Sequence, residues 1–479
     1  MYGRGLEEAV KPFCEKIRSV AEDDSNTCIM THHDADGLIS ASIISMTLLR
    51  LGAKCVVRPI SDMVPAVIEQ MKSEAHDFYI ISDLGAGLGA ALNDALGDRW
   101  IIIDHHQLPD EELTGPYSAQ ILNAFKYSID GGSEISSGGL AYLLANQIEK
   151  RNWDLSPIAV VSAISDNQDQ GDKKSLISIN SEIIKTAESH GLITVDLDLI
   201  FTGRETKPLH EALASTSFPY IDGITWNREN AYAVIKNSGV RMMENGRWRV
   251  LAEIPQEEKS IILDAIVKFV ATSSKYKTAN LTENLVGYTY TLVNEDLRSQ
   301  LRDAREFSTL LNACGRTGRA GIGVGICMGD RYVCLTEGEQ IADTYRAILG
   351  KSISTILTEK WRTIDNGRSI FVNAENVLAE EMLGAVSSLL SGSPTLGDRV
   401  LFVWTVSRDG MHKFSCRKCI GCKSGSDLGL VVRNCAESVG GIGGGHKAAA
   451  GCKVPSSRLE DFVSCVRRAI LDSKFTNSS

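Results

Sequence analysis

The chain has 479 residues, a length that predicts two or three domains. Hydrophobic residues make up 43% and charged residues 23% of it, as in an ordinary soluble globular protein. The formal net charge of −10 argues against a general coat protein for nucleic acids.

The sequence predicts neither a signal peptide nor a membrane span. Residues 1–10 carry mixed charge without an apolar core, and no uninterrupted run of about 18 apolar residues occurs. The twelve cysteines are spread along the chain, which favours free thiols in a reducing compartment over a disulfide framework. We therefore expect a cytoplasmic protein that does not bind membranes.

The charge is distributed unevenly along the chain. From Leu401 onward there are 12 Lys or Arg and 6 Asp or Glu, so this segment carries +6 and the rest carries −16. A basic C-terminal segment fits a protein that binds phosphates. On charge alone, basic residues on solvated helices remain the simpler explanation.

The first part of the chain alternates apolar runs with amphipathic segments. This alternation predicts an open parallel sheet covered by helices. The predicted helices span 7–22, 37–51, 63–75, 88–96 and 140–149, and the predicted strands are 27–30, 53–60, 78–83 and 100–104, with an edge strand over 119–123.

The turn after the first strand, Thr31 to Gly37, carries candidate metal ligands. In an extended segment His32, Asp34 and Asp36 would point to one side. Two carboxylates and an imidazole that converge on one point favour a bound cation. An Asp-x-Asp-Gly sequence is also typical of a capped turn, so this stretch alone leaves both interpretations open.

Three further apolar runs end in residues of the ligand type: Asp83, the triplet Asp104-His105-His106, and Asp166, which we expect to close a helix. Parallel strands place such residues at one edge of a sheet. Carboxylates and imidazoles without thiolates suit Mn²⁺ or Mg²⁺. The number of candidates suggests two divalent cations, which could clamp both oxygens of a phosphoester displacement. Ser136 to Gly139 is favoured as a helix cap over a phosphate site.

A glycine-dense stretch, Gly440 to Gly451, lies near the end of the chain. A glycine-rich loop allows the backbone to approach a phosphate closely, although many such loops are merely flexible. His446 and Lys447 strengthen the phosphate interpretation. Arg316 and Arg319 are further candidates for phosphate contacts, with surface positions equally open.

Taken together, these motifs resemble those of the DHH phosphoesterases. The His-x-Asp-x-Asp-Gly sequence at 32–37, Asp83, the triplet at 104–106 and Asp166 match that family in order. The glycine-dense stretch resembles the signature of the associated C-terminal domain, DHHA1. The resemblance implies an α/β fold with a parallel-sheet DHH domain over 1–175, a helical or mixed insertion over 176–285, and a smaller mixed α/β DHHA1 domain over 286–479 across a cleft.

The resemblance also implies roles for individual residues. Two divalent cations, Mn²⁺ first and Mg²⁺ second, would be held by His32, Asp34, Asp36, Asp83, His105 and Asp166. His106 would contact the scissile phosphate or orient a ligand, Asp104 would fix an imidazole, and His33 would reach the substrate. Ser415 and Arg417 match a Ser-x-Arg motif of DHHA1. The implied substrate-binding residues are Ser415, Arg417, Gly443, Gly444, Gly445, His446 and Arg316.

The insertion contains predicted helices over 175–190 and 257–273 and predicted strands at Tyr232–Ile235 and Trp248–Ala252. Its size, with the stretch Leu311 to Arg316, resembles archaeal relatives of the exonuclease RecJ. Those relatives are GINS-associated nucleases and counterparts of the replication factor Cdc45. The implied function is a metal-dependent exonuclease acting on single-stranded DNA or RNA in replication or repair, with GINS as a partner. Polarity and sugar preference remain open.

Several alternatives compete with this interpretation. A Cdc45-like scaffold without activity would lack metal ligands, whereas every ligand position is filled here. An enzyme of the family that cuts short RNAs or cyclic dinucleotides would not need the large insertion, and a manganese pyrophosphatase would lack the glycine-rich stretch. Cys416, Cys419 and Cys422 could bind zinc or an iron–sulfur cluster, with Cys435 or Cys452 as fourth ligand; free thiols are favoured.

Overall fold

The computed structural model describes residues 4–273, 281–393, 396–445 and 447–472. The chain folds into two compact units, each made of three segments. The first comprises Met1–Ala212, Arg241–Ser260 and Thr282–Asp343, and the second comprises Leu213–Val240, Ile261–Leu281 and Thr344–Ser479. The division of the sequence at residues 175 and 285 stays a prediction.

A five-stranded sheet forms the centre of the first unit. All neighbouring strands are parallel, in the order β2-β1-β3-β4-β5, which confirms the predicted parallel sheet with an edge strand near residue 120. The strands are β1 (Thr27–His32), β2 (Cys55–Ile60), β3 (Phe78–Ser82), β4 (Trp100–Asp104) and β5 (Ile121–Asn123). The three central strands are apolar runs because both faces of a parallel sheet are covered.

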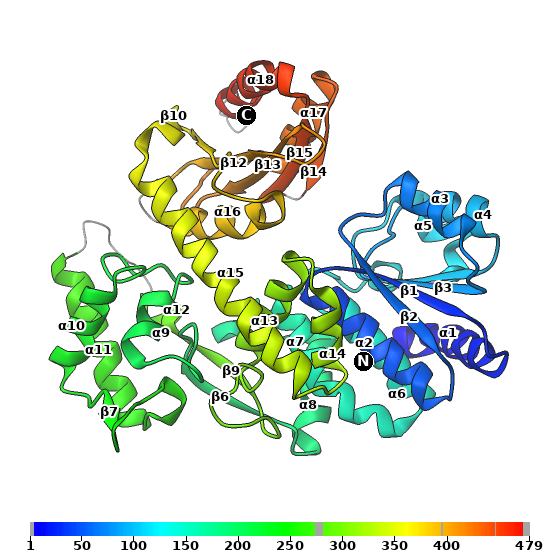
Figure 1. Ribbon diagram of the computed structural model, residues 1–479, viewed down its shortest axis with the longest axis horizontal. Helices are drawn as coiled ribbons and strands as arrows, with labels where there is room; N and C mark the ends of the chain where they lie inside the picture. The colour runs from blue at the N-terminus through cyan, green and yellow to red at the C-terminus, as the bar shows by residue number, and fades with distance from the viewer. Residues whose placement is uncertain (1–3, 274–280, 394–395, 446, 473–479) are drawn as a thin grey trace. The chain divides into compact units, whose positions relative to one another are not determined.

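Helices cover both faces of this sheet (Figure 1). On one face, α3 and α4 pack over a cluster that includes Tyr79, Trp100 and Ile102. Each of these side chains is fully buried and stabilises the fold by about 1.5–3 kcal/mol. On the other face lie α1, α2 and α6. The bounds are α1 (Arg4–Glu22), α2 (Ala35–Arg50), α3 (Pro65–Ser73), α4 (Gly89–Leu96), α5 (Asp110–Thr114) and α6 (Ser137–Ile148).

A helical layer continues from α6. The helix α7 (Ser156–Ser165) packs against α2, α6 and α8 (Ser178–Ser189), and α13 (Ala304–Arg316) packs against both α2 and α7. The helix α14 (Ala320–Cys327) packs against α2 and α13. Residues from beyond position 300 therefore lie against the helix that follows β1.

The remaining elements of the first unit include two small antiparallel sheets. These consist of β6 (Ile193–Leu199) with β9 (Val286–Leu292), and β7 (Met243–Glu244) with β8 (Arg247–Trp248). The short helix α12 (Leu281–Leu285) precedes β9. Three helices, α9 (Leu209–Ser215), α11 (Gln256–Ser273) and α15 (Val333–Thr358), begin in the first unit and end in the second.

Two strands predicted in the insertion are wrong. Tyr232–Ile235 lies inside the helix α10 (Arg228–Ser238). The Asn227 side chain caps this helix, and Gly239 ends it with φ +81°, so the terminal signals outweigh the β-branched and aromatic run. Of Trp248–Ala252, only Trp248 belongs to a strand, because a 3-10 turn follows at Leu251–Glu253.

The second unit is built on a six-stranded mixed sheet in the order β10-β11-β12-β13-β15-β14. Only β11 and β12 run parallel. Its strands are β10 (Thr363–Asp365), β11 (Ser369–Asn373), β12 (Val400–Val406), β13 (His412–Lys418), β14 (Ile442–Gly445) and β15 (Ala449–Val454). This mixed α/β architecture agrees with the prediction for the C-terminal part.

Helices lie on both faces of the second sheet as well. The helices α17 (Leu428–Ser438) and α18 (Leu459–Asp472) enclose an apolar core that contains Phe402, Phe414 and Phe462. The helix α16 (Leu383–Ser391) packs on β12 and β13 from the other face, where Ser387 meets Ser415. Within the described residues, no helix has both the length and the apolar character that crossing a membrane would require.

Candidate metal centre

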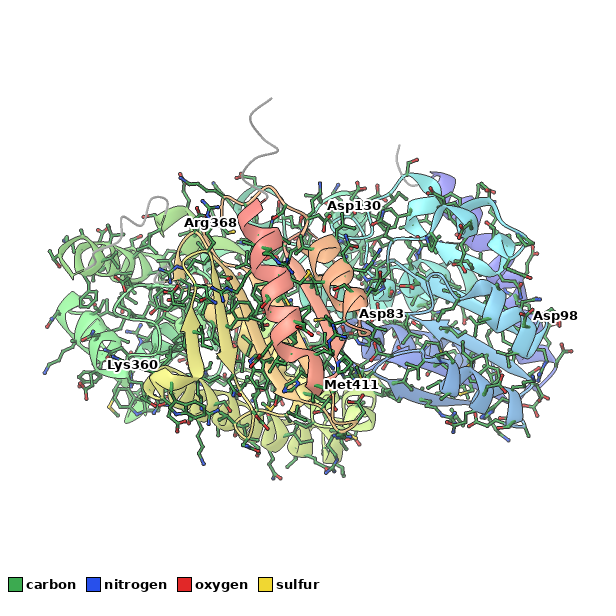
Figure 2. The ribbon with its side chains drawn as sticks, turned by 90° about the horizontal axis from the view of Figure 1, so that it is seen from above. Asp83, Asp98, Asp130, Lys360, Arg368 and Met411 are labelled. Carbon is green, nitrogen blue, oxygen red and sulfur yellow. A yellow bond between two sulfur atoms is a disulfide. The ribbon has the colours of Figure 1, made fainter. Side chains whose placement is uncertain are left out.

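The candidate ligands of the first unit gather at the carboxyl edge of the parallel sheet. The strand β1 ends at His32, Asp83 follows β3, and β4 ends at Asp104. Figure 2 shows Asp83 at this edge, while Asp98, which precedes β4, lies at the opposite edge. The sheet topology therefore brings together residues that are far apart in the sequence.

The first group of candidate ligands consists of His32, Asp34 and Asp83. Nδ1 of His32 lies 2.8 Å from Oδ2 of Asp34 and 3.7 Å from Oδ2 of Asp83. The other carboxylate oxygen of Asp34 accepts a hydrogen bond from the Gly37 amide at 3.1 Å and caps α2. Asp34 can therefore cap the helix and belong to the ligand group at the same time, because each role uses a different carboxylate oxygen.

The second group consists of Asp36, His105 and Asp166. Nε2 of His105 lies 3.1 Å from Oδ2 of Asp166 and 3.6 Å from Oδ2 of Asp36. The expectation that Asp36 shares one face with His32 and Asp34 is wrong. The helix α2 begins at Ala35, so the chain turns before Asp36 and directs this side chain to the second group.

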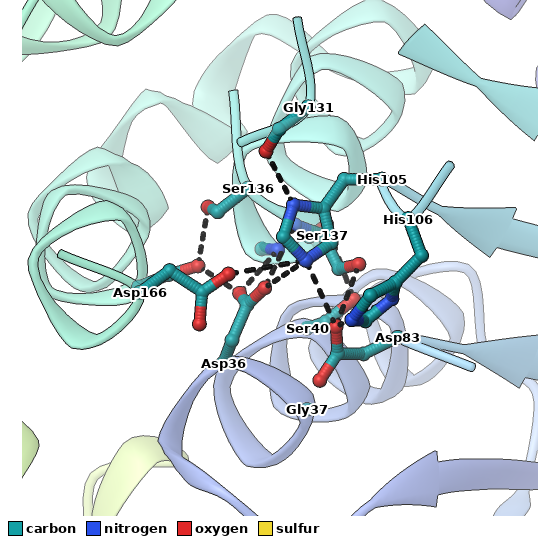
Figure 3. Close-up of polar contacts among 12 residues, drawn as sticks. Asp36, Gly37, Ser40, Asp83, His105, His106, Gly131, Ser136, Ser137 and Asp166 are labelled. Carbon is teal, nitrogen blue, oxygen red and sulfur yellow. Dashed lines mark hydrogen bonds and ion pairs between the residues drawn. The ribbon is translucent and has the colours of Figure 1, made fainter. Parts of the chain in front are cut away.

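The third group connects the other two and consists of Asp83, His105 and His106 (Figure 3). Oδ1 of Asp83 lies 3.5 Å from Nε2 of His105 and 4.0 Å from Nδ1 of His106. Asp83 belongs to two groups and so does His105, so the three form one continuous cluster. Asp166 follows the last residue of α7, as expected.

Mutual electrostatic effects among these residues are large. Burial lowers the pKa of His32, but the carboxylates of Asp34 and Asp83 outweigh it and raise that pKa well above its ordinary value. The pKa of His105 is raised likewise, with burial opposed by Asp166 and Asp83. The raised pKa values favour protonated imidazoles, whose positive charge offsets the negative charge of the carboxylates. A bound cation could supply the same positive charge.

The carboxylates respond in two ways. Burial, together with the charges of Asp83 and Asp166, raises the pKa of Asp36 well above its ordinary value, and burial also raises the pKa of Asp166. In contrast, His32 outweighs burial and lowers the pKa of Asp34. Buried carboxylates in contact with one another destabilise each other unless positive charge lies between them.

This donor set fits a hard divalent cation. Within the described residues, the ion pairs of Asp34, Asp36, Asp83 and Asp166 are all with imidazoles. In each of the three groups the ligand atoms lie within 4.8 Å of one another. Oxygen and imidazole donors at this density suit Mn²⁺ or Mg²⁺.

Asp104 and His33 lie beside the groups rather than in them. Oδ1 of Asp104 is 2.7 Å from Nδ1 of His106, and Oδ2 accepts a hydrogen bond from the Ala86 amide at 3.1 Å. Burial opposes the ionisation of Asp104, but His106 lowers its pKa to about 2. Nδ1 of His33 lies 3.2 Å from the Ile60 carbonyl oxygen.

Helix α13 supports the turn that carries Asp34. The amide of Ala35 donates a hydrogen bond to Oδ1 of Asn312 at 3.2 Å. A Cβ atom at Gly315 would overlap the carbonyl oxygen of His33, so only glycine permits this approach. Arg316 follows directly and, after burial and His32, contributes to the lowered pKa of His33. Arg319 pairs with Glu337 instead.

The residues predicted to bind substrate in the C-terminal domain lie in the second unit. The hydroxyl groups of Ser415 and Ser387 are 2.7 Å apart, and Nε of Arg417 donates to Oγ of Ser388 at 3.3 Å. Gly443, Gly444 and Gly445 belong to the edge strand β14 rather than to a loop. His446 lies outside the described residues.

The cysteines differ from the prediction in one pair. Cys435 of α17 and Cys465 of α18 form a disulfide, with Cα atoms 5.7 Å apart, so the expectation of free thiols throughout is wrong for these two. Cys416, Cys419 and Cys422 are free thiols. Among the described residues, no candidate metal group includes a cysteine.

Sequence reasoning missed several polar residues that contact the candidate ligands. The amides of Ser137 and Gly138 bind the Asp36 carboxylate, and the Ser137 hydroxyl binds Asp83. The side-chain amide of Gln168 donates to the carbonyl oxygen of Gly131, which also contacts Nδ1 of His105. The Ser136 to Gly139 stretch was visible as a helix start, and Ser136 does cap α6 through the Gly139 amide. The carboxylate that this stretch binds is that of Asp36, about one hundred residues earlier, and nothing in the local sequence indicates this contact.

Three family models match the chain in succession. The DHH family N-terminal domain matches residues 26–164, the DHH-CID domain matches 201–286, and the DHHA1 domain matches 367–472. An uncharacterized protein of Methanocaldococcus jannaschii is 26% identical over 450 residues, which are 92% of this chain and 92% of that protein.

Solved structures share the fold at low sequence identity. Cdc45 from Entamoeba histolytica has a TM-score of 0.64 at 13% identity, covering 97% of this chain and 99% of that one. An exonuclease RecJ bound to manganese has a TM-score of 0.57 at 16% identity, covering 99% of this chain and 97% of that one.

RecJ in complex with Mn²⁺ from Thermus thermophilus has a TM-score of 0.58 at 16% identity. The match covers 98% of this chain but 55% of that RecJ, so the chain spans about half of its length. Because the DHH, DHH-CID and DHHA1 models match in this order along the chain, the chain belongs to the DHH/DHHA1 family.

Proposed function

We propose that this protein is a metal-dependent phosphodiesterase that releases nucleotides from an end of single-stranded DNA or RNA. The observation that carries the proposal is the continuous cluster of three ligand groups connected by Asp83 and His105. A single structural ion would need one such group, whereas a chain of overlapping groups has donors for two ions. The family assignment supports the same reaction class.

Two divalent cations, Mn²⁺ or Mg²⁺, would be held by His32, Asp34, Asp36, Asp83, His105 and Asp166. When bound, such a pair supplies an activated water and neutralises charge that develops on the phosphate. Asp83 lies in both the His32 group and the His106 group, so its carboxylate has the position to serve both ions. Asp36 and Asp166 would serve one of them.

His106 would bind the phosphate that is cut. Its side chain is 49% exposed, in contrast to the buried His105, so it can reach a substrate. Oδ1 of Asp104 accepts a hydrogen bond from Nδ1 of His106, and in the doubly protonated imidazole Nε2 also carries a hydrogen that it can donate to a phosphate oxygen. Burial lowers the pKa of His106, but Asp104 outweighs it and raises that pKa, which favours the cationic donor.

Each unit, taken by itself, has further candidate residues for substrate contacts. Arg316 lies one residue beyond the close approach of Gly315 to His33, where a guanidinium could bind a neighbouring phosphate. In the second unit, Ser415 and Arg417 share one face of β13, and the backbone of Gly443 to Gly445 forms an edge. We assign these residues to binding of the strand away from the cut.

The decisive experiment uses single-stranded DNA and RNA labelled separately at each end, with EDTA, Mg²⁺ or Mn²⁺. We expect metal-dependent release of nucleotides that is abolished by Asp83→Ala and by Asp166→Ala. Asp98→Ala is the matched control, because this exposed aspartate lies at the opposite edge of the same sheet. The label that is released first gives the polarity, and the two substrates give the sugar preference.

Tight strand binding without cleavage under any metal condition would contradict the proposal. That outcome would favour the scaffold function, which the fold shared with Cdc45 makes the second candidate. Partnership with GINS stays a prediction from the sequence resemblance. Gel filtration with the GINS complex of the same organism tests it, and separate elution would remove it.

A further inference from the structure

The N-terminus of α6 contacts the candidate metal centre and binds two of its carboxylates. The amide of Ser137 donates to Oδ2 of Asp36 at 3.0 Å, and the amide of Gly138 donates to Oδ1 at 2.9 Å. The Ser137 hydroxyl donates to Oδ1 of Asp83 at 3.0 Å. One residue therefore contacts a carboxylate from the second ligand group and a carboxylate from the other two (Figure 3).

A second serine completes the hydrogen bonds of Asp36. The Ser162 hydroxyl donates to Oδ1 of Asp36, and its oxygen lies 2.6 Å from that of Ser136. A Cβ atom at Gly138 would overlap Oγ of Ser162, so glycine at this position keeps the serine in place. Ser136, Ser137 and Ser162 are fully buried. The hydroxyl groups of these three serines are therefore held in place by the surrounding protein atoms and are shielded from solvent.

The arrangement leaves a specific part of Asp36 available. Oδ1 accepts two hydrogen bonds, from Gly138 and Ser162, which use both of its lone pairs. Oδ2 accepts one, from Ser137, and lies 3.6 Å from Nε2 of His105. The remaining lone pair of Oδ2 is thus the one that the second ligand group can use.

From these contacts we infer that Ser137 is a positioning residue that sets Asp36 and Asp83 relative to each other. Its amide orients Asp36, its hydroxyl orients Asp83, and both atoms are fixed by the start of one helix. Ser162 orients Asp36 alone. This inference rests on the proposed function, because it concerns the binding of two cations.

The two serines lead to different expectations. Ser137→Ala keeps the amide and removes only the hydroxyl that binds Asp83. Because Asp83 belongs to two ligand groups, this variant should weaken Mn²⁺ binding at both positions by about 10- to 100-fold. Ser162→Ala removes the hydroxyl contacts with Asp36 and Ser136 but none with Asp83, so it should weaken binding of one ion. The matched control is Ser45→Ala, a buried serine of α2 whose hydroxyl binds the Ala41 carbonyl oxygen of its own helix.

The experiment is a titration of the metal-free protein with Mn²⁺, read by the spin-resonance signal of free Mn²⁺ and by calorimetry. We expect two ions per chain for the wild type and for Ser45→Ala. A double-mutant cycle with Asp83→Asn separates positioning from a general structural effect. If Ser137 acts through Asp83, Ser137→Ala has no additional effect on affinity in the Asp83→Asn background.

The possible outcomes separate a failure of the proposed function from a failure of the role of Ser137. Failure of the wild type to bind Mn²⁺ would overturn the proposed function itself. Two ions bound by Ser137→Ala with wild-type affinities would overturn only the role of Ser137, and so would an equal loss in the Asp83→Asn background. Ser137→Thr retains a hydroxyl on the same carbon and should bind both ions; a loss equal to that of the alanine variant would also contradict the inference.

Discussion

The carbonyl oxygen of Gly131 lies 2.6 Å from Nδ1 of His105. Because a carbonyl oxygen only accepts hydrogen bonds, Nδ1 of His105 must carry a proton, and Nε2 is the atom directed at the carboxylates. The same carbonyl oxygen accepts a bond from Nε2 of Gln168 at 2.8 Å, and Gln168 in turn accepts one from Asn180 at 2.7 Å. A buried amide chain thus orients a candidate metal ligand.

Replacement of Gln168 by glutamate should weaken the metal centre. The carboxylate cannot donate to Gly131 or to Ile135, whose carbonyl oxygens bind the amide of the wild type. We expect Mn²⁺ affinity to fall by about 10- to 100-fold and the free energy of unfolding to fall by about 1–3 kcal/mol. Mn²⁺ titration and urea unfolding measure the two quantities. Gln170→Glu, at an exposed position two residues away, is the control; equal behaviour of both variants would refute this role.

Glu306 should make stability depend on pH. Burial and the nearby Asp303 raise the pKa of Glu306 to about 7, while its carboxyl group accepts bonds from the Glu205 amide and the Thr206 hydroxyl. A folded pKa above the unfolded value means that the folded state holds the proton more tightly. This contribution is therefore complete below about pH 4.5 and is lost as the pH rises through 7.

Glu306→Gln removes this titration. Between pH 4.5 and 8, the free energy of unfolding of the wild type should fall by on the order of 3 kcal/mol more than that of the variant. Urea unfolding at a series of pH values measures the difference. Glu182→Gln, on the exposed face of α8, should follow the wild-type profile. Parallel profiles for wild type and Glu306→Gln would show that Glu306 does not titrate in this range.

The sequence was most informative where local pattern and burial coincide. Apolar runs ending in Asp83 and Asp104 predicted parallel strands with their ends at one edge, because such strands are buried on both faces. The capping side chain of Asp34 was also a visible signal. The separation of Asp36 from Asp34 was not, because it depends on the residue at which α2 begins, and helix boundaries are weakly encoded locally.

Contacts between distant segments account for the rest. Nothing near Gly315 indicates that α13 packs on the turn after β1, and nothing near Ser137 indicates a carboxylate partner at position 36. The glycine-dense stretch predicts a loop, yet pairing with β15 extends Ile442–Gly445 into a strand. Disulfide partners cannot be deduced from spacing alone, which explains the missed pair Cys435 and Cys465.

Gly315→Ala should destabilise the first unit, although alanine usually stabilises helices. The added methyl group would overlap the carbonyl oxygen of His33, so α13 would have to move away from the turn. We expect a loss of about 1–3 kcal/mol in the free energy of unfolding and weaker Mn²⁺ binding. Gly350→Ala should have the opposite effect, because α15 has open space at that glycine. We expect the free energy of unfolding to rise by about 0.5–1 kcal/mol. Equal signs for the two variants would contradict this packing.

The disulfide between Cys435 and Cys465 should stabilise the second unit. It joins α17 to α18 across a sequence separation of 30 residues, and closing a loop of that length removes conformational freedom from the unfolded chain. Alkylation of the denatured, unreduced protein should therefore modify ten thiols, and twelve after reduction. Replacement of both cysteines by serine should lower the free energy of unfolding of this unit by about 3–4 kcal/mol.

Cys422→Ser, at a free thiol in the same unit, should leave the effect of a reductant on stability unchanged. Twelve modified thiols without reduction would show that the two cysteines are not joined.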